Sequence, residues 1–471
     1  MVEDDVCYLS AIELGARFRD RSLSPVEVTA AILTRIERLN PTLTAFITIS
    51  AERAMAHANA AERVFATDIE TRALTGIPIS IKDLTPTKGI RTTRGSLRDP
   101  NWVPDEDAPF VERVLAAGAV LLGKTNTPEL GWKGDSGNRV VGPTHNPWRH
   151  GQTAGGSSGG AAAAVAAGLG PLAQGSDGAG SIRIPAAFCG IVGFKPSFGL
   201  VPQYPPSLLG DLSHLGPMTR SVRDAALLLD VTAGADIRDR LSWSSGETYL
   251  ESCEGGIAGL RIAWSPDLGY AAIDPPVLAM AKAAAHRFTE LGAHVEEAHP
   301  RLGDPWDIIQ PLWACAMAGY HGPDLDRLRN LLDPGLLTVI LAGQTIPMTT
   351  LARAHQARNA YYQDWRSFME RFDLLLTPTL PITAFAAGND QPGNVAGHTT
   401  DFLSWTAFTY PFNLTGQPAI SVPCGFVDGL PIGLQIVGRP RADATVLRAA
   451  AAFESVAPWK HSYSTLSRSS G

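Results

Sequence analysis

Three serine hydroxyls stand in two glycine clusters near the middle of the chain, where their types and spacing suggest covalent chemistry. Ser157 and Ser158 lie in GGSSGG, and Ser181 lies in GAGS. The stretch from Gly151 to Gly180 holds ten glycines. Glycine at this density costs backbone entropy, so it indicates tight turns or close approach of the backbone to another group. A serine with small neighbours and accessible N–H groups is what a nucleophile with a backbone oxyanion hole requires.

A lysine upstream could supply the base for such a serine. In GIPISIKD, residues 76–83, three isoleucines alternate with three other residues, the last of which is Lys82. The alternation predicts a buried strand that ends at Lys82. One interpretation is a lysine whose stem packs along the strand while its ammonium reaches water. The other is a desolvated, neutral amine that can act as a base. Lys124, near the end of a second predicted strand, is another candidate, for which a structural role is favoured.

Other catalytic arrangements find less support. Residues 155–159 match the G-x-S-x-G nucleophile elbow, but that motif follows a strand, and HNPWRHGQTA before it is not strand-like. The eleven histidines include no HExxH motif, and no Walker A or GxGxxG pattern follows a strand, so neither a metal nor a nucleotide is expected. Cys189 lies in apolar AAFCGIVG and is interpreted as an unreactive thiol. Serine with lysine remains, and it is one of the solutions to acyl transfer.

Composition restricts the class of protein further. The 471 residues are 45% hydrophobic and 18% charged, as in globular proteins. The net charge is −7 and no basic block occurs, which disfavours a nucleic-acid partner. Five scattered cysteines without a CxxC pair indicate a reducing compartment. The N-terminal residues lack the apolar segment of a signal peptide, and no run of about 18 apolar residues occurs. We therefore expect a cytoplasmic protein without membrane contact.

Strands alternate with helices along the chain. The residue patterns predict strands at 43–49, 76–83, 119–126, 260–264, 374–381, 419–423 and 432–438, and helices at 26–39, 50–66, 108–118, 158–167, 221–233, 274–292, 349–372 and 442–455. The residues from about 300 to 343 are expected to be irregular. This alternation predicts an α/β fold. Because no internal repeat or long linker interrupts it, we expect one large domain over residues 1–471.

These residues together resemble the amidase signature family. The resemblance rests on GIPISIKD, GGSSGG and DGAGSIRIPAAFCGIVGFKP, with GKTNTPE, GPTHNPW, NLTGQPAISVP and GLPIGLQIVGRP elsewhere in the chain. It extends from about Ser24 to Ser455. It implies a mixed central β-sheet covered by helices on both faces. Within that fold we expect a core at about 76–200, a variable substrate-pocket region at about 201–400 and a C-terminal return to the core at about 401–456.

The resemblance also implies a Ser–cisSer–Lys triad. Ser181 matches the nucleophile, Lys82 matches the base, and Ser157 matches the serine that relays a proton between them. The peptide bond from Ser157 to its next residue is expected to be cis. Ser158 is given a structural role at the start of the following helix. Glycine-rich, charge-poor surroundings and the nearby helix N-terminus favour a neutral lysine, so activity is expected to rise toward alkaline pH.

A backbone oxyanion hole accompanies this triad in the family. It is expected from four consecutive N–H groups, those of Gly178, Ala179, Gly180 and Ser181. Asp177 and Arg183 match a supporting salt-bridged pair. The family commonly has glycine where Ala179 stands, and alanine permits fewer backbone conformations, so a slightly reshaped loop is expected.

The family implies hydrolysis of a C–N acyl bond without a cofactor or metal. We expect a small aryl or aliphatic carboxylic amide as substrate, with a carbamate (urethane) or an ester as the alternatives that the same chemistry serves. Five large apolar or aromatic side chains could line an apolar acyl or aryl pocket, or could simply belong to the core and the surface: Leu208, Leu209, Trp306, Trp313 and Tyr320.

Two functions of other classes stay open. The family includes an amidotransferase subunit that works on charged tRNA within a complex, and an inactive binding protein on this fold is conceivable. The intact triad positions disfavour the second. We expect the chain to be a monomer or a homodimer.

Overall fold

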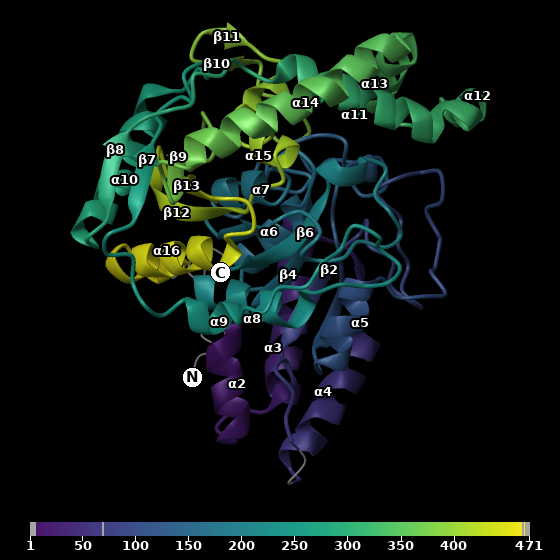
Figure 1. Ribbon diagram of the computed structural model, residues 1–471. Coiled ribbons are helices and arrows are strands. Elements are labelled where there is room, and N and C mark those ends of the chain that lie inside the picture. The colour runs from purple at the N-terminus through teal and green to yellow at the C-terminus, as the bar shows by residue number, and fades with distance from the viewer. Residues whose placement is uncertain (1–5, 68–69, 464–465, 467–471) are drawn as a thin grey trace.

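A mixed sheet of eleven strands forms the centre of the molecule (Figure 1). The computed structural model describes residues 6–67, 70–463 and 466. In their order across the sheet, the strands are β1 (Phe46–Ile49), β3 (Val120–Thr125), β2 (Pro78–Lys82), β4 (Leu172–Asp177), β6 (His214–Thr219), β5 (Val192–Lys195), β12 (Ala419–Val427), β13 (Leu430–Gly438), β9 (Leu374–Pro378), β7 (Arg261–Trp264) and β8 (His294–Glu297). A separate pair is formed by β10 (Asn394–Val395) and β11 (His398–Thr399).

The sheet is antiparallel through its centre, has parallel pairs on either side of that centre, and is antiparallel again at its β1 edge, where β1 pairs with β3. β2 pairs in parallel with β3 and β4, and β7 pairs in parallel with β8 and β9. The pairs from β4 through β6, β5, β12 and β13 to β9 are all antiparallel. The late strand β12 thus lies beside β5 from the first half of the chain, and β13 joins β12 to β9. Lys82 and Asp177 stand at the ends of β2 and β4.

Helices surround this sheet. They are α2 (Ala11–Arg19), α3 (Pro25–Leu43), α4 (Ala51–Phe65), α5 (Pro109–Ala116), α6 (Gly159–Ala166), α7 (Arg183–Cys189), α8 (Val222–Thr232), α9 (Tyr249–Ser252), α10 (Pro275–Glu290), α11 (Trp306–His321), α12 (Leu325–Leu328), α13 (Pro334–Thr345), α14 (Met348–Met369), α15 (Pro411–Leu414) and α16 (Asp443–Val456). Ser24 caps α3 and Ser221 caps α8, as their positions before apolar runs predict.

Alternate residues of each strand face different helices. In β9, Leu374 and Leu376 pack into the main core with residues of α10 and α16. Leu375 packs instead into a second cluster with residues of α11 and α14. Successive side chains of a strand point to opposite faces of the sheet, so helices cover both faces. The α/β fold with a mixed central sheet, expected from the sequence, is confirmed.

The expectation of irregular structure from about 300 to 343 is wrong, because α11 and α13 occupy most of it. α11 contains Pro311 in its interior and α13 begins at Pro334, where a proline fits the first turn. The two helices approach closely at Gly343, where an added Cβ would overlap the Ala314 carbonyl oxygen. Tertiary packing of these helices therefore outweighs the local breaking signals.

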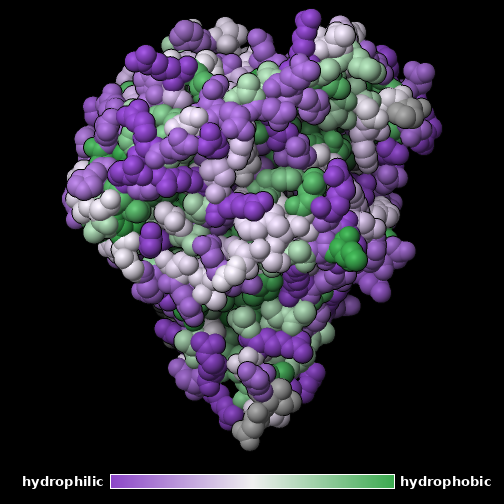
Figure 2. Space-filling view, in the orientation of Figure 1, coloured by the Kyte–Doolittle hydropathy of each residue, from purple (hydrophilic) through white to green (hydrophobic). Residues whose placement is uncertain are grey.

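Within the part of the chain that the structure describes, no single helix is both long and apolar enough to cross a membrane. α13 and α14 reach that composition only in combination, across a bend of 98°. On the face seen in Figure 2, hydrophobic residues are scattered among hydrophilic ones.

Candidate active site

Lys82 ends β2 in the interior of the molecule, with none of its surface exposed. Its amine nitrogen lies within hydrogen-bond distance of three serine hydroxyls. The distances from Lys82 Nζ are 2.7 Å to Ser157 Oγ, 2.8 Å to Ser158 Oγ and 2.9 Å to Ser176 Oγ. The structure therefore places this lysine inside the protein among neutral hydroxyls, and its ammonium does not extend to the surface.

Burial determines the charge of this amine. Burial lowers the pKa of Lys82 well below the ordinary value of lysine, and the negative charge of Asp177 opposes that shift. Hydroxyl groups can accept from or donate to an amine but bring no compensating charge. The site therefore favours the neutral amine, the form that can accept a proton.

The carboxylate next to Lys82 is directed elsewhere. Asp83 Oδ2 accepts hydrogen bonds from Thr93 N at 2.9 Å and from Thr93 Oγ1 at 2.6 Å. Asp83 Oδ1 lies 4.0 Å from Lys124 Nζ. Lys124 donates to Thr85 O at 2.6 Å and to Thr92 Oγ1 at 2.8 Å. Lys124 thus holds the loop after β2, which agrees with the structural role favoured for it.

The two serine clusters are joined by their backbones. Ser158, at the N-cap position of α6, donates its N–H to Ser181 O at 3.1 Å. The bond between Gly156 and Ser157 is cis. The expected position, after Ser157, was therefore one residue too late. Gly156 packs against Asp135 so closely that an added Cβ would lie 2.7 Å from the Asp135 backbone nitrogen.

The loop from Asp177 to Ser181 is held by the Asp177 carboxylate. Asp177 Oδ1 accepts from Gly180 N at 2.6 Å. Gly180 has a φ of 128° and packs against Thr409, so both its backbone conformation and the space beside it require glycine. Ala179, in contrast, has no positive φ and is buried in the second hydrophobic cluster. The loop therefore accommodates alanine at this position without backbone strain.

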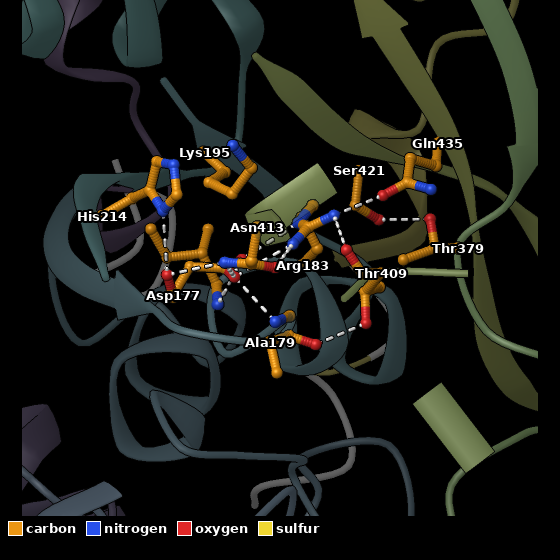
Figure 3. Close-up of polar contacts among 12 residues, drawn as sticks. Asp177, Ala179, Arg183, Lys195, His214, Thr379, Thr409, Asn413, Ser421 and Gln435 are labelled. Carbon is orange, nitrogen blue, oxygen red and sulfur yellow. Dashed lines mark hydrogen bonds and ion pairs between the residues drawn. The ribbon is translucent and has the colours of Figure 1, made fainter. Parts of the chain in front are cut away.

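A buried network connects this loop to the C-terminal part of the chain (Figure 3). All five N–H groups of Arg183 are bonded: to Asp177 Oδ1 and Oδ2 (both 3.0 Å), Thr409 O (2.9 Å), Gln435 Oε1 (2.8 Å) and Asn413 Oδ1 (2.7 Å). Asn413 Nδ2 donates to Asp177 Oδ1 at 2.9 Å. Burial alone would raise the pKa of Asp177, but Arg183, Lys195 and Asn413 hold it well below its usual range.

Thr409 adds a direct tether to the loop. Its Oγ1 lies 2.6 Å from Ala179 O and 3.0 Å from Thr406 O. The sequence motifs place Asp177 and Arg183 together but do not identify Thr409, which lies outside them. Asn413 and Gln435 could have been found, since they lie in the motifs NLTGQPAISVP and GLPIGLQIVGRP.

A cavity of about 210 Å³ opens onto the serines. Its polar wall includes Ser157, Ser176 and Ser181. The apolar wall comes from four regions of the chain and includes Leu84, Leu130, Leu208, Leu209, Leu215 and Trp313, with Tyr320 beside them. The sequence left open whether five side chains line a pocket or belong to the core and surface. Four of them line the cavity: Leu208, Leu209, Trp313 and Tyr320. The fifth, Trp306, packs against the second hydrophobic cluster.

Comparisons with known proteins agree with this arrangement. The family model described as Amidase matches residues 27–447. An acylamidase of Rhodococcus erythropolis is 42% identical over 468 residues, which cover 98% of each chain. A glutamyl-tRNA(Gln) amidotransferase subunit of Moorella thermoacetica is 37% identical, over 96% of this chain and 97% of the relative. The solved structure of a bacterial aryl acylamidase of the amidase signature family superposes with a TM-score of 0.92 and 32% identity, covering 98% of each chain.

The chain belongs to the amidase family and has the fold of the amidase signature enzymes. Its relatives support the hydrolysis of amides as its class of reaction.

The tether from Thr409 leads to a testable prediction. Thr409→Val removes the hydroxyl bonded to Ala179 O and leaves a buried carbonyl without that partner, so we expect a loss of about 1–3 kcal/mol in the free energy of unfolding. The loosened loop should also lower kcat. Urea unfolding and steady-state kinetics measure both effects.

Thr415→Val is the matched control, because Thr415 Oγ1 is buried and has no hydrogen-bond partner among the described residues. This variant should be close to wild type in both measurements. Equal losses in the two variants would contradict the role given to the Thr409 hydroxyl.

Proposed function

We propose that this chain hydrolyses acyl amides through a covalent intermediate on Ser181, with Ser157 as the proton relay and Lys82 as the base. The observation that carries the proposal is the 2.7 Å separation between Lys82 Nζ and Ser157 Oγ. This contact lies inside the protein, and the cavity beside it is lined by both Ser157 and Ser181. A buried neutral amine next to a hydroxyl chain is a base that needs no histidine.

The proton follows the serines in this proposal. Neutral Lys82 accepts the proton of Ser157, which accepts the proton of Ser181 as Ser181 Oγ attacks the amide carbonyl. The tetrahedral intermediate collapses when the relay returns a proton to the leaving amine nitrogen and the C–N bond breaks. Water then attacks the acyl-enzyme, giving up its proton to the same relay, and releases the carboxylic acid and Ser181.

Backbone N–H groups stabilise the oxyanion in this proposal. Of the four groups expected from the sequence, that of Gly180 already donates to Asp177 Oδ1. We therefore assign the oxyanion to the N–H groups of Gly178, Ala179 and Ser181, and we assign to Gly180 the task of fixing the loop. Among the described residues, the N–H groups of Ala179 and Ser181 have no hydrogen-bond partner. Donors fixed before the reaction contribute more than donors that must reorient during it.

The cavity favours amides of aryl or aliphatic carboxylic acids. Leucine side chains and Trp313 make up its apolar wall, which suits a hydrophobic acyl or aryl group. Two relatives are named as an acylamidase and an aryl acylamidase, and these names support an acyl amide as the substrate here. Carbamates and esters remain alternative substrates because their carbonyls enter the same acyl transfer.

The charge of the cavity argues against glutamine as the substrate, although amidotransferase subunits are among the relatives. Glutamine carries an ammonium group, and a buried ammonium requires a compensating carboxylate. The described residues that line the cavity include neither aspartate nor glutamate. We therefore favour acyl-amide hydrolysis by this chain without a partner subunit.

Turnover by the purified chain tests this assignment. The chain alone should release 4-nitroaniline from 4′-nitroacetanilide and should release no ammonia from glutamine above the level of a Ser181→Ala control. Absorbance of the nitroaniline and an enzymatic ammonia assay measure the two reactions. Ammonia release from glutamine without anilide hydrolysis would favour the amidotransferase alternative instead.

The dependence of the rate on pH tests the base. Burial lowers the pKa of Lys82, and the neutral amine is the active form, so kcat/KM should rise with pH through that lowered pKa. Lys82→Met should lower kcat by about 10²- to 10⁴-fold and remove this acid limb.

Lys82→Arg is the matched control. The guanidinium of arginine stays protonated at every pH measured, so this variant should be as inactive as Lys82→Met. A wild-type profile that peaks below neutrality, or an unchanged acid limb in Lys82→Met, would exclude Lys82 as the base.

A further inference from the structure

One charged side chain lines the cavity among the described residues, and it is Arg94. Its neighbours on the wall are neutral, and no carboxylate among the described residues forms an ion pair with it. The cavity therefore combines a serine-lined reaction centre, an apolar wall and a single uncompensated positive charge.

The backbone of Arg94 is fixed to the residues around the reaction centre. Arg94 N donates to Asp83 O at 3.2 Å, and Asp83 directly follows Lys82. Leu130 N, on the same cavity wall, donates to Arg94 O at 2.8 Å. Arg94 has a φ of 57°, in the left-handed region that non-glycine residues rarely adopt. Such a conformation persists where surrounding contacts enforce it, and it is commonest at functional sites.

The guanidinium group of Arg94 is held by an aromatic ring, which leaves its N–H groups available to a ligand. Its guanidinium carbon lies 4.2 Å from the centroid of the Trp102 ring. Stacking on an aromatic ring fixes the plane of a guanidinium and leaves the N–H groups, which lie in that plane, free to donate. The side chain donates one hydrogen bond within the described residues, from Nη1 to Tyr320 Oη, and it is long at 3.4 Å.

Arg183 shows what a structural arginine does in this protein. Its five N–H groups each have a partner in the buried network. Arg98, which does not line the cavity but lies 5.9 Å from the ring of Tyr320 on its wall, is compensated by Asp99 and Asp324 at 3.4 Å. Arg94 has neither saturated donors nor a counter-charge, although it lies half-buried beside the reaction centre.

We propose that Arg94 binds a carboxylate of the substrate, so that this site prefers acyl amides that carry an anionic group away from the scissile bond. The inference rests on the proposed function and specifies its substrate class. The planar fork of a guanidinium matches a carboxylate with two parallel hydrogen bonds, and such charge-assisted bonds are stronger than neutral ones. A glutamine zwitterion does not meet the same requirement, because its ammonium still lacks a partner on this wall.

Two pairs of matched substrates test the proposal. 4-Acetamidobenzoate and 4′-nitroacetanilide differ in charge but have similar planar groups on the amine side. N-Phenylsuccinamate and 4-oxo-N-phenylpentanamide make the same comparison on the acyl side. For each pair the measurement is the ratio of kcat/KM for the anionic substrate to kcat/KM for the neutral one, so intrinsic reactivity cancels between variants.

Arg94→Gln should lower this ratio by about 10- to 100-fold in at least one pair, as expected for the loss of a charge-assisted hydrogen bond. Arg94→Lys should retain part of the preference, because it keeps the charge but loses the fork. Arg98→Gln is the matched control and should leave the ratio unchanged. An unchanged ratio in both pairs for Arg94→Gln, or an equal decrease in Arg98→Gln, would overturn the proposal.

Binding separates this inference from the proposed function. Calorimetry of 4-acetamidobenzoate and of N-phenylsuccinamate with the Ser181→Ala variant, with and without Arg94→Gln, requires no turnover. Weaker binding of either anion with Arg94→Gln supports the carboxylate site even if neither amide is hydrolysed, in which case only the proposed function fails. Equal binding of both anions in the two variants rejects the role of Arg94, whatever the activity of the wild type.

Discussion

The structure around the site depends on one constraint, the burial of a lysine amine without a carboxylate against it. An isolated buried charge is so costly that the group instead shifts its pKa and becomes neutral. The surroundings of Lys82 enforce this outcome, since its three partners are serine hydroxyls. Two carboxylates that could compensate it are engaged elsewhere: Asp83, the next residue in the chain, with Thr93 and Lys124, and Asp177 with Arg183. Because these carboxylates pair with other groups, neither forms an ion pair with Lys82, and its amine stays available as a base.

A second requirement is a rigid loop from Asp177 to Ser181, because this loop positions Ser181 at the cavity. The Asp177–Arg183 pair is wholly buried, and such pairs are tolerated only when every remaining donor and acceptor is satisfied. Thr409, Asn413 and Gln435 satisfy them from the C-terminal part of the chain. That segment lies beside the loop because β12 and β13 pair into the centre of the sheet. The sheet topology is therefore what brings the last third of the chain to the site.

Local patterns in the sequence predicted much of this fold but fewer of the residues that hold the loop around Ser181. The alternation that ends at Lys82 gave β2 correctly, and the α/β class followed from the order of elements. β4 and β6 were not identified, because LAQGSD and HLGPMT contain too few β-branched residues and carry glycine or proline. The helices near 300–343 were missed because their prolines indicated breaks that packing between α11 and α13 outweighs. Contacts such as Arg183 with Gln435, 252 residues apart, leave no trace in local periodicity.

The identity of the nucleophile is the central claim, and a covalent label tests it most directly. Wild type and Ser181→Ala would be treated with a serine-directed fluorophosphonate, and the intact masses would be measured. The account predicts a single adduct on the wild type that Ser181→Ala lacks, with turnover lost in the same variant. An adduct that persists in Ser181→Ala, especially one that maps to Ser157, would contradict it and reassign the nucleophile to the GGSSGG cluster.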